Sequence, residues 1–255
     1  MVAYLGAPCS PQPLVFGGDH SLYRQSWAPE QLLSGSVNAD GYGVVWYHEG
    51  VPRRVAEARP IWHEEDLEGM LGSVSSTCIL AALRNATPGQ RVDGAALLPL
   101  THDRYSFVLN GFVPHFHARH MREMRAELPD DLYAALRGSS DAETLFLLAV
   151  ARVREGAGPA EALEEVARRV HSRVAPEEAQ MNMLLADGER IGILRSATVL
   201  VTNSLYASWN PPFAPHGVVV ASEPLDGAAA WVPLDGHHRF ELGPDGLSEG
   251  TLVFF

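Results

Sequence analysis

The sequence predicts an α+β fold, with strands at the two ends of the chain and helices in the middle. Short runs rich in β-branched and aromatic residues occupy the first and last thirds. Two long segments between them carry apolar residues at helical spacing. No internal repeat or low-complexity linker divides the 255 residues, so we expect residues 1–255 to form a single domain.

The expected strands are bounded by turn residues. In chain order they cover residues 1–6, 43–48, 53–61, 77–84, 104–113, 181–186, 190–195, 197–202, 217–222 and 251–255. Asp187-Gly188 separates two of these runs and predicts a tight hairpin. The expected helices cover residues 119–128, 130–136, 141–154 and 159–174. The third has an acidic first turn and a basic last turn, as helix ends prefer.

Composition excludes several classes of function. The net charge of −12 argues against a nucleic-acid partner, which would need a concentrated basic face. No apolar run is long enough to cross a bilayer, and no secretion signal is visible at the start. Cys9 and Cys78 are too few for a disulfide framework, so we expect a cytoplasmic protein. Nothing in the sequence indicates its oligomeric state.

Four short segments carry more specific information. Residues 84–89 (RNATPG) follow one apolar run, and residues 109–111 (LNG) lie near the end of another. Residues 139–143 (SSDAE) open an expected helix, and residues 38–43 read NADGYG. Each motif alone is weak, but the ordered set is specific.

In order and spacing these segments resemble the class II glutamine amidotransferases, which have an N-terminal nucleophile. Weaker matches at residues 20–29 and 221–226 point to the subfamily that removes glutamate from γ-glutamyl-hercynylcysteine sulfoxide in ergothioneine biosynthesis. The resemblance runs from Val2 to about Pro233. It implies a four-layer αββα sandwich that hydrolyses a small-molecule γ-glutamyl amide through a thioester. It implies no cofactor, no metal and no membrane partner.

The resemblance also assigns roles to six residues. Arg84, Thr87 and Gly89 would bind the glutamyl α-carboxylate, and Asp141 would hold the α-amine. Asn110 and Gly111 would form the oxyanion hole. An arginine suits the first role because its planar fork matches a carboxylate in two bonds.

Each of these motifs has a simpler structural explanation. Arg84 could be an ordinary surface arginine, and Asp141 an ordinary helix N-cap. Asn110-Gly111 is also typical of a type I′ hairpin turn, and Pro88-Gly89 of a loop turn.

The family's nucleophile is an N-terminal cysteine, and it is missing from this chain, which begins Met1-Val2-Ala3. Cys9 lies beyond the first expected strand without a free amine, and Cys78 lies in an apolar run typical of an inert buried thiol. Either Met1 is an internal methionine a few codons after a true Met-Cys, or the protein binds γ-glutamyl compounds without cleaving them. The persistence of the six site residues favours the first explanation.

A different class of function rests on the histidines. His115, His117 and His120, with His102 and Asp103 nearby, could coordinate a divalent metal, so the alternative is a metal-dependent hydrolase. No Asp or Glu lies at a matching spacing within the cluster, which favours a solvated loop.

Overall fold

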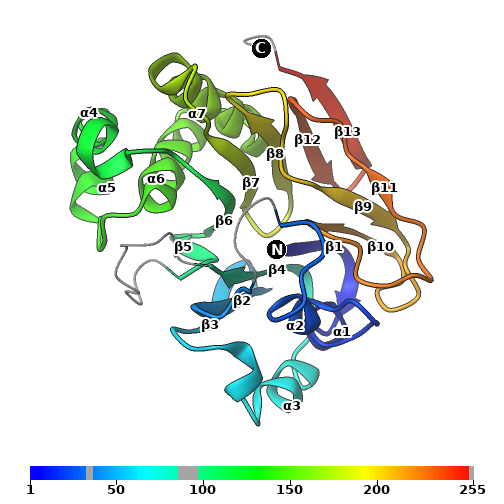
Figure 1. Cartoon of the computed structure of the whole chain (residues 1–255). Coiled ribbons are helices and arrows are strands. Elements are labelled where there is room, and N and C mark those ends of the chain that lie inside the picture. The colour runs from blue at the N-terminus through cyan, green and yellow to red at the C-terminus, as the bar shows by residue number, and fades with distance from the viewer. Residues whose placement is uncertain (33–36, 86–96, 253–255) are drawn as a thin grey trace.

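The computed structural model describes residues 1–32, 37–85 and 97–252, which form two antiparallel sheets with helices outside them (Figure 1). In the described residues the first sheet has the strand order β11-β9-β10-β1-β4-β2-β3. Its strands are β1 Val2–Cys9, β2 Gly41–His48, β3 Val51–Glu57, β4 Ser76–Arg84, β9 Tyr206–Trp209, β10 Gly217–Ala221 and β11 Val232–Pro233. The second sheet has the order β13-β12-β8-β7-β6-β5. Its strands are β5 Leu100–His102, β6 Tyr105–Phe112, β7 Gln180–Ala186, β8 Ile191–Ala197, β12 His238–Gly243 and β13 Gly246–Thr251.

Helices cover the outer face of each sheet (Figure 1). The first sheet carries α1 Gln12–Val15, α2 Leu22–Gln25, the 3₁₀ turn η1 Ile61–His63 and α3 Leu67–Gly72. The second carries the π turn η3 Phe116–His120, α4 Met121–Arg125, α5 Asp130–Ala134, α6 Asp141–Arg154 and α7 Pro159–Val174. The arrangement is the expected four-layer αββα sandwich.

Alternation along the strands explains the layers. In β1, Ala3 faces the core between the sheets, whereas Val2 and Tyr4 face α1–α3 on the outside. Both faces of the central strands are therefore buried, and such strands are apolar almost throughout rather than alternating with polar residues. This is why the run that became β4 looked continuously hydrophobic.

The helix boundaries of α6 and α7 agree with the sequence prediction, as does the hairpin between β7 and β8. In its turn Gly188 has φ +93°, and the Asp187 carboxylate accepts bonds from the backbone N–H groups of Glu189 (3.0 Å) and Arg190 (2.7 Å). In the described residues no helix is both long enough and apolar enough to cross a membrane.

The prediction of a strand at residues 197–202 is wrong. β8 ends at Ala197, and the following segment is irregular up to β9. Leu200 is 86% exposed there, so its apolar character does not contribute to a core. The Gln180 side chain instead forms hydrogen bonds with the backbone here: it donates to the Val201 carbonyl (2.9 Å) and accepts from the Asn203 N–H (2.9 Å).

Other expected strands differ at their ends, and four strands of the described residues were missed. β3 ends at Glu57, where the chain turns into η1 rather than continuing to residue 61. The last expected strand is displaced toward the N-terminus as β13, and residues 253–255 lie outside the described part. β5, β9, β11 and β12 were not predicted because they are short or carry several polar residues.

Candidate active site

A cavity of about 380 Å³ lies where the two sheets meet the first turn of α6. Met1, at the start of β1, lines it together with Arg84 from β4, Asn110 and Gly111 from β6, and Asp141 from α6. The fold thus gathers four of the sequence-predicted site residues, which are far apart in the chain. Thr87 and Gly89 lie outside the described residues.

Arg84 is the last residue of β4 and is only 9% exposed. It pairs with Gly41 of β2, and its carbonyl accepts the Asp40 N–H at 3.1 Å. Pairing with β2 therefore fixes the Arg84 backbone, and the residue lines the cavity. An ordinary surface arginine is excluded by this burial.

Asn110-Gly111 lies inside β6, opposite Asn182 and Met181 of β7, so the hairpin-turn explanation is wrong. A Cβ on residue 111 would lie 1.8 Å from the carbonyl oxygen of Gln180, far inside van der Waals contact. Glycine is needed here because the two backbones approach so closely.

The Asn110 side chain is oriented by a neighbour. The side-chain nitrogen of Asn203, Nδ2, lies 3.4 Å from Asn110 Oδ1 and 3.2 Å from the Asn110 backbone carbonyl oxygen. With Oδ1 engaged as acceptor, Asn110 Nδ2 is left as the donor. Asn203 is itself fixed, because the Asn182 amide donates to its carbonyl (3.3 Å) and Gln180 accepts its N–H. Asn203 carried no signal in the sequence, because it matches no motif and only follows the strand expected at residues 197–202.

Asp141 is the first residue of α6, and Ser140 is the N-cap, accepting the Glu143 N–H at 3.1 Å. The simple N-cap explanation of Asp141 is therefore wrong. Its carboxylate accepts the Val113 N–H (2.8 Å) and the Ala142 N–H (2.9 Å). Burial raises the pKa of Asp141, although these two bonds act in the opposite direction. A cation bound at the carboxylate would offset the cost of that desolvation.

Glu143 braces the loop ahead of the helix. Its buried carboxylate accepts the backbone N–H groups of Arg137 (2.7 Å) and Gly138 (3.0 Å). Because α6 begins immediately after this loop, these bonds help to fix the position of Asp141.

The start of β1 is enclosed. The Met1 ammonium donates to Ser222 Oγ at 2.9 Å, and burial lowers its pKa from 8.0 to about 6, with Glu223 opposing the shift. Glu223 in turn lies 2.7 Å from His20 Nε2 and accepts the Glu30 N–H at 2.8 Å. These contacts hold the 20–30 segment against the cavity. The motif at residues 221–226 marked this region without identifying what Glu223 does.

Neither cysteine belongs to the cavity lining. Burial raises the pKa of Cys9 to about 11 and raises that of Cys78 as well. Both thiols therefore stay protonated near neutral pH and are poor nucleophiles.

The histidine cluster does not assemble into a metal centre. His115 and His117 are exposed, whereas His120 is buried, and His115 Nε2 lies 3.5 Å from Glu177 Oε2. Across the described ranges, the group whose ligand atoms converge within 4.8 Å is a different one, Asp235, His238 and Glu249. The geometry gives the metal-dependent alternative no support.

No family model matches the chain. It is 28% identical to the gamma-glutamyl-hercynylcysteine sulfoxide hydrolase of Mycobacterium tuberculosis (strain CDC 1551 / Oshkosh) over 97% of this chain and 94% of that protein. A solved class-II glutamine aminotransferase domain protein from Silicibacter pomeroyi shares the fold, with a TM-score of 0.75 at 22% identity, covering 99% of this chain and 98% of the other. The hydrolase of Mycolicibacterium smegmatis with the same name is 30% identical over 246 residues, 94% of each protein. The chain therefore belongs to the gamma-glutamyl-hercynylcysteine sulfoxide hydrolase family.

Proposed function

We propose that the protein hydrolyses the amide bond of γ-glutamyl-hercynylcysteine sulfoxide and releases L-glutamate, a step of ergothioneine biosynthesis. The names of the relatives support the substrate class. The observation that carries the proposal is the convergence of Arg84, Asn110, Gly111 and Asp141 on one cavity. A γ-glutamyl compound is a small molecule, and the cavity is of a size for one.

The glutamyl head presents a carboxylate and an ammonium on one carbon, and the cavity offers one partner for each. Arg84 would take the α-carboxylate in a two-bond, charge-assisted contact. Asp141 would take the α-ammonium, which stabilises the ionised carboxylate that burial disfavours. By the family resemblance, Thr87 and Gly89 would also bind the α-carboxylate.

The oxyanion would form at β6. When a nucleophile adds to the γ-carbonyl, its oxygen becomes negative, and preorganised N–H donors then stabilise it far more than they stabilise the ground state. Asn110 Nδ2 is available for this role because Asn203 engages Oδ1. The Gly111 backbone N–H is the second donor.

The nucleophile would be an N-terminal cysteine placed by β1. Val2 pairs with Ala81 of β4, so a residue two positions ahead of Met1 would lie opposite Arg84 if the pairing continued. Its thiolate would add to the γ-carbonyl, and the C–N bond would break as the amine leaves with a proton. Water would then cleave the thioester, releasing glutamate and the thiol. The cysteine's own α-amine would serve as the base.

Glutamate release tests the proposal directly. We would compare protein beginning Cys-Arg-Met1 with otherwise identical protein beginning Ser-Arg-Met1, using γ-glutamyl-hercynylcysteine sulfoxide as substrate. We expect release with the cysteine form only. No release by the cysteine form, or equal release by both forms, would contradict the assignment. Protein beginning at Met1 is expected to bind the substrate without turning it over.

A further inference from the structure

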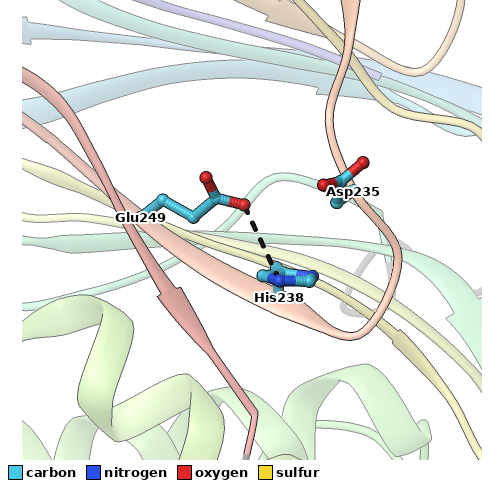
Figure 2. Close-up of side chains that lie close together, drawn as sticks. All are labelled: Asp235, His238 and Glu249. Atoms are coloured by element: carbon cyan, nitrogen blue, oxygen red, sulfur yellow. Dashed lines mark ion pairs between the residues drawn. The ribbon is translucent and has the colours of Figure 1, made fainter.

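Asp235, His238 and Glu249 form a second cluster, away from the cavity and sharing no residue with its lining. Asp235 follows β11, the edge strand of the first sheet, whereas His238 and Glu249 lie on the β12–β13 hairpin at the edge of the second. One ligand atom from each of the three lies within 4.8 Å of the others. In Figure 2 the carboxylate of Glu249 reaches toward the ring of His238, with Asp235 on the adjacent loop.

Strand register accounts for the convergence. His238 of β12 pairs with Thr251 of β13, and Glu249 is two residues before Thr251, so its side chain falls on the same face of the hairpin. The result is a separation of 3.8 Å between His238 Nε2 and Glu249 Oε1. That distance is too long for a direct hydrogen bond but suits two ligands of one ion.

The ring of His238 is held in the tautomer that a metal requires. Its Nδ1 lies 2.8 Å from the Gly236 carbonyl oxygen, which can only accept, so Nδ1 carries the hydrogen. In the neutral ring Nε2 then keeps its lone pair, 3.8 Å from Glu249 Oε1 and 3.3 Å from the Thr251 hydroxyl, which a bound metal would replace as its partner. Metal-binding histidines are oriented in the same way, with the second ring nitrogen donating to a backbone carbonyl.

We propose that Asp235, His238 and Glu249 bind a divalent transition metal, with Zn²⁺ as the best match. A set of one imidazole and two carboxylates is borderline in softness, and Zn²⁺ accepts both donor types in a tetrahedral site. Water would fill the fourth position, because Asp235 and Glu249 are exposed to solvent. Ca²⁺ and Mg²⁺ fit poorly because they prefer oxygen ligands alone.

The ion would fasten the edges of the two sheets to each other. It would hold Asp235 in place. The carbonyl of the preceding residue, Leu234, accepts a hydrogen bond from Arg195. Arg195 Nε also donates to the Asn203 carbonyl at 2.8 Å, and Asn203 contacts Asn110. The metal would therefore stabilise the loop that supports the proposed oxyanion donor, without touching substrate.

Calorimetric titration of tag-free, chelator-treated protein with Zn²⁺ tests the site. We expect a binding step that weakens at least about tenfold in His238→Gln and in Glu249→Gln, since even changes outside the ligand shell reach that size. His48→Gln and Asp245→Asn are matched controls, because both side chains are exposed and neither belongs to the cluster. They should leave the step unchanged. Zn²⁺ should also raise the melting temperature of the unmodified protein and of the controls, but much less in the two site variants.

Three outcomes would overturn the proposal. These are no Zn²⁺ binding, unchanged affinity in both site variants, and tighter binding of Mg²⁺ or Ca²⁺ than of Zn²⁺. Glu249→Gln keeps the test valid if His238→Gln fails to fold, because the Glu249 side chain is 52% exposed.

Discussion

Replacing Arg84 by Lys separates charge from geometry in the proposed glutamyl clamp. Lysine keeps the positive charge but offers a point ammonium in place of the planar fork, so one of two charge-assisted bonds to the α-carboxylate is lost. Arg84 is 9% exposed, so water replaces the lost bond poorly. A hydrogen bond to a charged group contributes about 1.5–3 kcal/mol, so the Kd for L-glutamate should rise by roughly ten- to hundredfold.

Asp141→Asn gives the complementary result. The neutral amide loses its attraction for the α-ammonium, a change of about 2–5 kcal/mol for a desolvated charge pair. Glutarate has the same two carboxylates but no amine. Asp141→Asn should therefore weaken the binding of L-glutamate strongly and that of glutarate little, whereas Arg84→Lys should weaken the binding of both ligands.

Isothermal titration calorimetry with the two ligands is the assay, and each variant has a matched control. Arg53→Lys alters an exposed arginine of β3, and Asp130→Asn alters an exposed aspartate that, like Asp141, is the first residue of a helix. Both controls should bind L-glutamate normally. Arg84→Lys with unchanged Kd, or Asp141→Asn weakening glutarate as much as glutamate, would refute the clamp.

Four further predictions concern the cavity and its surroundings. Gly111→Ala places a Cβ 1.8 Å from the Gln180 carbonyl oxygen, so the free energy of unfolding measured in urea should fall by at least about 1–3 kcal/mol. Gly69→Ala, in open space on α3, should not lower it, and equal unfolding free energies for the two variants would contradict the close approach at Gly111. Cys9, with its pKa raised to about 11, and buried Cys78 should react slowly with iodoacetamide at pH 8, and rapid labelling of either would show a thiolate. In protein beginning at Met1, the pKa of the Met1 amine is about 6 in the folded state against 8.0 in the unfolded state, so between these pH values the unfolded state binds more protons. The free energy of unfolding should therefore rise by up to about 2.7 kcal/mol from pH 6 to 8, and N-terminal acetylation should abolish that rise. Asn203→Ala, in protein beginning with cysteine, should lower kcat more than it raises KM, because it acts through Asn110; a change in KM alone would mean a binding role.

The sequence predicted the parts of the site that local motifs encode. Ser140 caps α6, so the position of Asp141 at a helix start was visible, and the apolar runs around Arg84 and Asn110 placed both on strands. The mutual approach of these residues depends on strand order and register, which periodicity does not contain. It was predicted only because the ordered motifs resemble a known family.

Other features had no local signal. Asn203 orients Asn110 across ninety-three positions of sequence, and it lies just after the segment expected to be a strand. Asp235, His238 and Glu249 match no motif spacing, because the β12–β13 register and the loop after β11 bring them together. The hairpin explanation of Asn110-Gly111 failed because Gly111 meets a close strand neighbour rather than forming a turn.

A crystal structure of the protein with L-glutamate tests the central claim most directly, because it depends on neither the nucleophile nor turnover. We predict the α-carboxylate in two hydrogen bonds with the Arg84 guanidinium and the α-ammonium beside the Asp141 carboxylate. The γ-carboxylate should point toward Asn110 Nδ2 and the Gly111 N–H. Glutamate bound in the reverse direction, or bound away from these residues, would contradict the proposed function of the cavity.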